Sequence, residues 1–81
     1  MPRYRLNLNE CGVYTLDQEG FEFAHLQAAR AAGVAAARDI MADEVKKGKL
    51  CLSCRIEVTD DDGAVLLVVP FREAVEVQGL D

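Results

Sequence analysis

The sequence lacks the long apolar stretch that a membrane-spanning helix requires. No run among its 81 residues approaches the roughly 18 consecutive apolar side chains of such a helix. The opening residues, MPRYRLNLNE, alternate polar and apolar side chains, so they also lack the apolar core of a signal peptide. These absences argue against a membrane-bound or exported protein, and we expect a cytoplasmic one.

Positive charge is also scarce. Nine lysines and arginines against fourteen aspartates and glutamates give a formal net charge of -5 at pH 7. A protein that binds DNA or RNA usually presents a basic surface, because contacts to phosphate supply much of the affinity. We therefore expect no nucleic-acid partner, and the short basic run KKGK, residues 46–49, better suits the end of a helix.

Few side chains could support metal or redox chemistry, since the chain has three cysteines and a single histidine. An odd number of cysteines without an export signal favours reduced thiols over a disulfide framework. The candidates for a thiol or metal site are Cys11, His25, Cys51 and Cys54.

The stretch LCLSC, residues 50–54, raises the question of whether Cys51 and Cys54 form such a site. If both lie in a strand, they point to opposite faces about 10 Å apart, too far to share one zinc ion. The pair also follows a predicted helix, whereas a redox Cys-x-x-Cys motif usually begins one. We expect Cys54 to be a small core residue and His25 to cap the helix or face solvent, with no catalytic residue, metal or cofactor.

The organisation of the chain predicts a single domain over residues 1–81, without repeats or linkers. Residues 3–9 alternate polar and apolar, NECG supplies a turn, and VYTL resumes an extended run, so residues 3–16 predict a hairpin. Residues 52–59 alternate again, and Asp62-Gly63 is a strong hairpin turn. The five large apolar residues 65–69 predict a strand that is buried on both faces.

Residues 26–47 are rich in alanine and free of proline, which predicts one long helix that ends at Gly48. Its apolar stripe has an unusually small volume, so we expect the helix to lie flat and close against a sheet. The fold class is therefore α+β, with the order β-β-α-β-β and a four-stranded, mostly antiparallel sheet covered by the helix on one face. The predicted stripe consists of Leu26, Ala29, Gly33, Ala36, Ala37, Ile40 and Met41.

The face of the sheet opposite the helix is expected to carry exposed apolar side chains, and such patches usually mark contact surfaces. The candidate interface residues are Leu66, Val68 and Phe71. Two alternatives would bury this face: the tail from Phe71 to Val77 could fold back over it, or a second molecule could pack there.

Several short motifs, taken in order, resemble a family of small bacterial proteins of unknown function. The motifs are MPRY, then DQEG at 17–20, LQAAR at 26–30, AARDIMADE at 36–44, RIEVTDDDG at 55–63 and VLLVVPFREAV at 65–75. The chain departs from the family pattern at Asn7 and His25, where aspartate is usual, and at Cys54, where tryptophan is usual. The resemblance implies no activity or cofactor, and the missing aspartate cap predicts a frayed helix start.

Together these observations predict a non-enzymatic interaction or regulatory module that binds another protein, including a second copy of itself as a homodimer. An alternative, from a different class, is a small-molecule or metal-binding protein that uses the cysteines and the histidine. Light scattering and elemental analysis distinguish the two.

Overall fold

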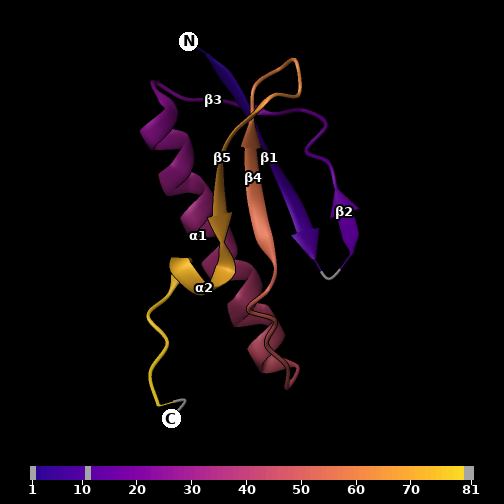
Figure 1. Ribbon diagram of the computed structural model, residues 1–81, viewed down its shortest axis with the longest axis vertical. Helices are drawn as coiled ribbons and strands as arrows, with labels where there is room; N and C mark the ends of the chain where they lie inside the picture. Colours follow the sequence, from indigo (N-terminus) through magenta and orange to yellow (C-terminus); the bar gives the residue numbers. More distant parts are fainter. Residues whose placement is uncertain (1, 11, 80–81) are drawn as a thin grey trace.

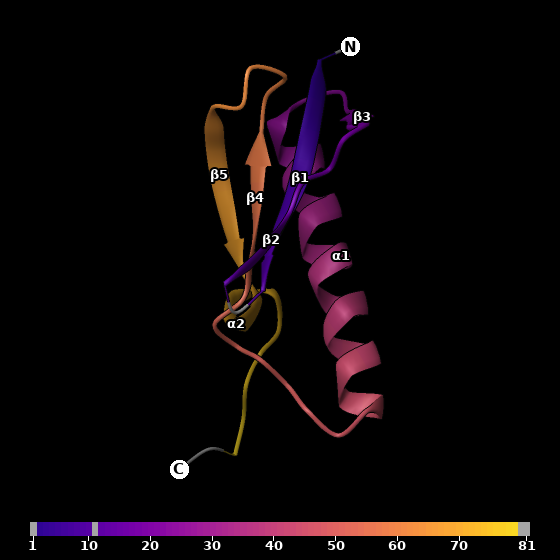
Figure 2. The same ribbon diagram turned by 90° about the vertical axis from the view of Figure 1, so that its right-hand side faces the viewer.

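One long helix covers one face of an antiparallel sheet, as the sequence predicts (Figures 1 and 2). The computed structural model describes residues 2–10 and 12–79. In chain order its elements are β1 (Arg3–Glu10), β2 (Val13–Thr15), β3 (Phe21–Glu22), α1 (Leu26–Lys46), β4 (Arg55–Thr59), β5 (Val65–Pro70) and α2 (Phe71–Ala74). The predicted α+β class is confirmed, and β3 and α2 are short additions that the sequence did not indicate.

The sheet has the strand order β2-β1-β4-β5, and β3 also pairs with β1. Every pairing is antiparallel, with Asn7 opposite Glu57 between β1 and β4, and Val58 opposite Leu67 between β4 and β5. Because β4 is flanked by β1 and β5, it is an interior strand, and two of its side chains, Ile56 and Val58, are almost completely buried.

The core lies between α1 and the inner face of the sheet, and the small residues of the helix allow a close approach. At Gly33 a built Cβ atom would lie 3.4 Å from Val69 Cγ2 and 3.8 Å from Ile56 Cγ2. The prediction of a thin, flat helix face is therefore confirmed at this position. The residues of α1 that are buried are Ala29, Gly33, Ala37 and Met41.

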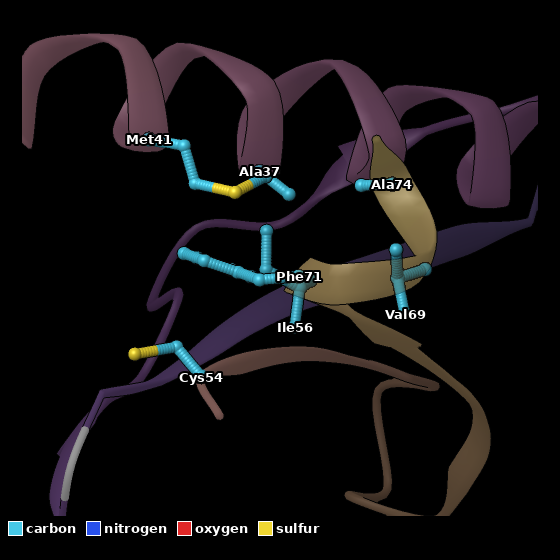
Figure 3. Close-up of a cluster of buried hydrophobic side chains, with 7 residues drawn as sticks. All are labelled: Ala37, Met41, Cys54, Ile56, Val69, Phe71 and Ala74. Atoms are coloured by element: carbon cyan, nitrogen blue, oxygen red, sulfur yellow. The ribbon is translucent and has the colours of Figure 1, made fainter. Parts of the chain in front are cut away.

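Phe71 is at the centre of the larger apolar cluster (Figure 3). Its exposed fraction is 0%. Its selection as an interface residue was therefore wrong, because the chain turns into α2 directly after Pro70 and carries Phe71 inward. Arg38 on α1 fixes this turn, since its Nε donates a hydrogen bond of 2.7 Å to the Ala74 carbonyl.

The start of α1 is capped by His25. Its Nδ1 accepts a hydrogen bond of 3.1 Å from the Ala28 amide, as an aspartate cap would. The helix ends at Lys46 and is followed by the C-cap residue Lys47 and by Gly48, whose φ of 87° is typical of the residue after a helix C-cap. The predicted helix is confirmed with nearly the predicted bounds, and its first turn is capped where fraying was expected.

Two predictions about the last two strands were wrong. The strand predicted for residues 52–59 begins only at Arg55, because Leu52 and Ser53 form a bend. The strand predicted to be buried on both faces, β5, is at the edge of the sheet and exposes Leu66 and Val68, each by 42%. The α2 segment packs against α1, so in the described structure it does not cover this side of β5.

Candidate functional site

The outer face of the sheet, opposite α1, is polar over β1 and β4. Asn7 and Thr59 are buried there, and the Asn7 side-chain amide donates a hydrogen bond of 3.4 Å to the Thr59 hydroxyl. Beside them Tyr14 donates a hydrogen bond of 2.7 Å to a Glu57 carboxylate oxygen, and this bond, more than burial, raises the pKa of Tyr14. The expected apolar outer face is therefore restricted to β5.

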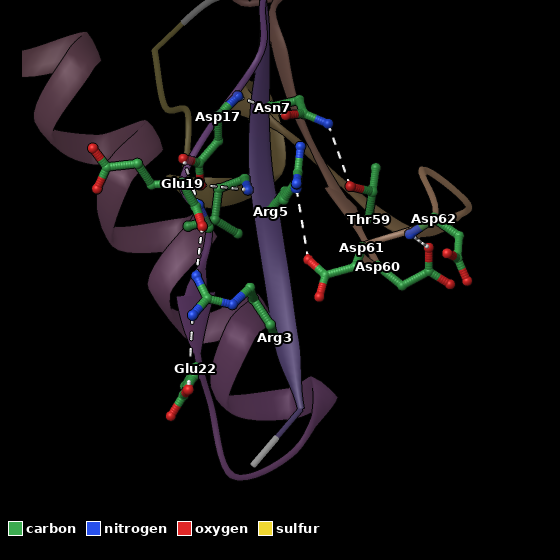
Figure 4. A network of polar contacts seen from close by, with 12 residues as sticks. Arg3, Arg5, Asn7, Asp17, Glu19, Glu22, Thr59, Asp60, Asp61 and Asp62 are labelled. Atoms are coloured by element: carbon green, nitrogen blue, oxygen red, sulfur yellow. Dashed lines mark hydrogen bonds and ion pairs between the residues drawn. The ribbon is translucent and has the colours of Figure 1, made fainter.

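Asp17 organises the polar side of β1 (Figure 4). One of its carboxylate oxygens accepts a hydrogen bond of 3.2 Å from the Leu6 amide, and the other accepts one of 3.1 Å from the Gly20 amide. The Asp17 amide in turn donates a 2.8 Å hydrogen bond to the Asn7 side-chain oxygen. Leu6 lies between the segments of β1 that pair with β3 and β2, so the carboxylate replaces a strand partner at this point.

Local contacts also explain why the last residue of the DQEG motif, Gly20, is a glycine. Gly20 has a φ of 73°, and a Cβ atom built on it would lie only 3.1 Å from the Tyr4 carbonyl oxygen. A side chain would therefore crowd the β1 backbone as well as strain its own. The Asp-x-x-Gly spacing of residues 17–20 thus has a structural explanation, because both carboxylate oxygens of Asp17 bind backbone amides of this chain.

The arginines near this turn form weaker contacts. Arg3 donates a hydrogen bond of 2.6 Å to the Glu19 carbonyl and lies 3.8 Å from a Glu22 carboxylate oxygen. Arg5 lies 3.7 Å from an Asp61 carboxylate oxygen. These side chains are partly exposed, so the ion pairs contribute little to stability.

We use the term β5 surface for the exposed side chains of Val65, Leu66 and Val68. Their exposed fractions are 53%, 42% and 42%. Leu66 is the extra residue of a β-bulge, because Val65 is opposite Thr59 while Leu67 is opposite Val58. The sequence selected Leu66 and Val68 for this surface, and both are exposed. In the described part of the chain β5 pairs only with β4, so its other side is an edge of the sheet.

Cys51 and Cys54 lie side by side, contrary to the sequence prediction. The Cys54 thiol donates a hydrogen bond to Cys51 Sγ at a sulfur–sulfur distance of 2.8 Å, and the Ser53 hydroxyl lies 3.3 Å from Cys51 Sγ. The prediction was wrong because both cysteines precede β4 and the bend between them turns their side chains together. Cys54 is 1% exposed and packs in the core as predicted, whereas Cys51 is only partly buried.

His25 does not join this pair, and Cys11 lies outside the described residues. His25 caps the N-terminus of α1, whereas Cys51 follows the C-terminus of this helix, which has 21 residues and is therefore about 30 Å long. A site that combines the histidine with Cys51 and Cys54 is not formed. In residues 2–10 and 12–79, no three histidine, cysteine or acidic side chains are arranged to hold a metal ion.

A hollow of about 470 Å³ lies between the end of β1 and the last turns of α1. Its lining includes Glu10, Glu44 and Lys49. Burial raises the pKa of Glu10 above its ordinary value of 4.5, a hydrogen bond and charge repulsion from Glu44 raise it further, and Lys49 partly opposes the shift. Nearby, Lys47 lies 3.3 Å from an Asp43 carboxylate oxygen, so the hollow mixes both signs of charge.

The fold and these surfaces define a small α+β domain in which β5 exposes apolar side chains at an edge of the sheet. The chain belongs to the family described as Domain of unknown function (DUF6894), whose model matches residues 3–72. This match confirms the resemblance to an uncharacterised family seen in the sequence. No curated protein and no solved structure matches the chain. Among the described residues, neither helix combines the length and the apolar character needed to cross a bilayer.

Proposed function

We propose that this domain is a non-enzymatic interaction module that binds a second copy of itself through β5. One observation carries the proposal: β5 is an edge strand that exposes apolar side chains and contains no charged residue over Val65–Pro70. Natural proteins usually protect such edges with charges, prolines, bulges or very short strands, because an open edge pairs readily with another strand.

The protection that β5 does have is confined to its two ends. The bulge lies at Leu66, near the start of the strand, and Pro70 is its last residue. At the other edge of the sheet, β2 has only three residues and is short enough to offer little pairing surface. Association through the edge is therefore expected at β5, where the backbone groups of Leu67 and Val68 lie between the two protected ends.

A second copy is the partner that fits this edge best. Two identical strands can pair antiparallel around a two-fold axis, so that each apolar side chain meets an apolar surface of the other copy. Because β5 is uncharged, this pairing avoids the repulsion that the net charge of -5 would cause between other surfaces. It also adds buried surface to a chain whose own core is small.

The expected affinity follows from the exposed area. Burying the exposed half of a valine or leucine side chain contributes roughly 1 kcal/mol, so the three side chains from each copy contribute roughly 6 kcal/mol in total. Association costs at least about 4 kcal/mol in lost translational and rotational freedom, and we expect the strand hydrogen bonds to offset about half of this cost or more. The net free energy is then roughly -4 to -6 kcal/mol, so we expect a weak dimer with a dissociation constant between about 40 µM and about 1 mM.

Sedimentation velocity from about 10 µM to about 1 mM tests this proposal over the expected range. The wild-type chain should shift from monomer to dimer as its concentration rises. Val68→Lys places a charge on the β5 surface and should keep the chain monomeric. Val45→Lys is the matched control, because Val45 is an equally apolar residue that is 56% exposed on α1.

The control variant should dimerise like the wild type, and circular dichroism should show both variants folded. A wild-type chain that stays monomeric up to about 1 mM would refute the proposal. Equal loss of dimer in both variants would place the interface elsewhere, since only Val68 is on β5.

A further inference from the structure

The bend before β4 brings two sulfur atoms together at the surface of the core. Cys51 Sγ and Cys54 Sγ are 2.8 Å apart, closer than two sulfur atoms in simple van der Waals contact. A disulfide bond has a length of about 2.05 Å, so closing one requires a movement of less than about 1 Å. The bend of Leu52 and Ser53 already supplies the turn that such a short loop needs.

We infer that Cys51 and Cys54 are a redox-active pair that is converted to an intramolecular disulfide by exchange with a small disulfide such as oxidised glutathione. The Cys51 thiolate attacks one sulfur of the small disulfide, whose S–S bond breaks and releases one glutathione thiolate. The Cys54 thiolate then attacks Cys51 Sγ, and the second glutathione leaves. The two protons of the cysteines pass to the two glutathione thiolates, so two thiols are oxidised and one disulfide is reduced.

Burial sets the order of these two steps. Cys51 is partly exposed and can meet a reagent from solution, whereas Cys54 is 1% exposed and cannot. Cys54 nevertheless points its thiol at Cys51 Sγ, which is the position from which it would resolve a mixed disulfide. Cys51 is therefore the entry thiol and Cys54 the resolving thiol.

A backbone hydrogen bond holds the resolving cysteine in place. The Cys54 carbonyl accepts this bond, of 2.9 Å, from the Phe71 amide at the start of α2. The inference does not depend on the proposed association through β5.

The test uses the full chain with Cys11→Ser, because Cys11 lies outside the described residues and could compete as a third thiol. After incubation with oxidised glutathione, mass spectrometry should show a chain lighter by two hydrogens and thiol titration should show the loss of both remaining thiols. Cys54→Ala in this background should instead accumulate one glutathione adduct on Cys51. Cys51→Ser should react more slowly than Cys54→Ala by about tenfold or more, because its remaining thiol is buried.

Peptide mapping of the wild-type chain completes the experiment. A Cys51–Cys54 linkage supports the inference, whereas a linkage that involves Cys11 overturns it. Two thiols that stay reduced in the Cys11→Ser chain would overturn it as well. So would stoichiometric zinc in protein purified without chelators, if this zinc is lost on Cys51→Ser. Circular dichroism of each variant shows whether it is folded, and the Cys11→Ser mass result tests the inference even if Cys54→Ala does not fold.

Discussion

Replacing Gly33 by alanine tests how closely α1 approaches the sheet. The added methyl group would lie 3.4 Å from Val69 Cγ2, 3.8 Å from Ile56 Cγ2 and 3.9 Å from Val58 Cγ2. The two longer distances are ordinary van der Waals contacts, and the shortest is at the lower limit of such contacts. The alanine therefore fits with at most a small movement of the Val69 side chain.

The expected gain in the free energy of unfolding of Gly33→Ala is the sum of two favourable contributions and one small cost. Alanine in a helix interior is about 1 kcal/mol more favourable than glycine, and burying a methyl group contributes up to about 0.8 kcal/mol. Crowding against Val69 removes part of this gain. We expect Gly33→Ala to raise the free energy of unfolding by about 1 kcal/mol, which corresponds to about 4–8 °C in Tm for a domain of this size.

Urea unfolding followed by circular dichroism measures this change. The matched control is Ala35→Gly at an exposed position of α1, which should lose about 1 kcal/mol from helix propensity alone. The double variant should be at least as stable as the wild type, and any excess is the packing contribution of the new methyl group. A loss of more than about 0.5 kcal/mol in Gly33→Ala would refute the reasoning, because the helix would then lie too close for a methyl group.

Three further changes test the polar contacts. Asp17→Ala should lower the free energy of unfolding by about 1–3 kcal/mol, because two backbone amides lose their acceptor, and urea unfolding measures the loss. His25→Asp should raise the stability by about 0.5 kcal/mol, measured as a higher Tm, because a carboxylate caps the Ala28 amide and favours the positive end of the helix. The pKa of Glu10 is raised above 4.5 in the folded chain, so the unfolded chain loses this proton first as pH rises, and folding stability falls. Glu10→Gln should therefore gain stability over the wild type between pH 4.5 and neutral pH, as urea midpoints at several pH values would show.

Each of these changes has an outcome that contradicts its reasoning. Asp17→Ala with wild-type stability would mean that water replaces the carboxylate without cost. A less stable His25→Asp would mean that the imidazole does more than cap the helix. If the stability difference between Glu10→Gln and the wild type does not change with pH, the Glu10 carboxyl has the same pKa in the folded and the unfolded chain.

The parts of the fold that the sequence predicts well depend on local patterns. The alanine-rich segment with small residues at helical spacing predicted α1 almost to the residue, because helix propensity and periodicity act within one turn. The alternation in residues 3–16 predicted the first hairpin for the same reason. His25 as a helix cap follows from its position just before the helix, although the use of Nδ1 is visible only in the structure.

The errors concern contacts between distant segments. Five consecutive apolar residues are equally consistent with a central strand and with an exposed edge strand, and only the strand order places β5 at the edge. The sequence places Phe71 in an apolar tail, but α2 carries it into the core. The contact between Cys51 and Cys54 depends on a bend that contains no glycine or asparagine, so the sequence did not predict it. The DQEG motif at residues 17–20 supports the family resemblance, but it does not indicate that the Asp17 carboxylate binds β1.

The two proposed sites share one junction of the chain, and its geometry argues that they act independently. Cys54 directly precedes β4 and Phe71 directly follows β5, and the hydrogen bond between their backbones joins the two strands at this end. Closing the proposed disulfide requires the two sulfur atoms to approach by less than about 1 Å, a movement that side-chain rotation can supply. Farther along the strands, Val68 stays opposite Glu57 and Leu67 opposite Val58 in a ladder that this rotation does not reach. We therefore expect the β5 surface to keep the same shape in the reduced and oxidised chains, so that the proposed self-association requires neither state of the thiols.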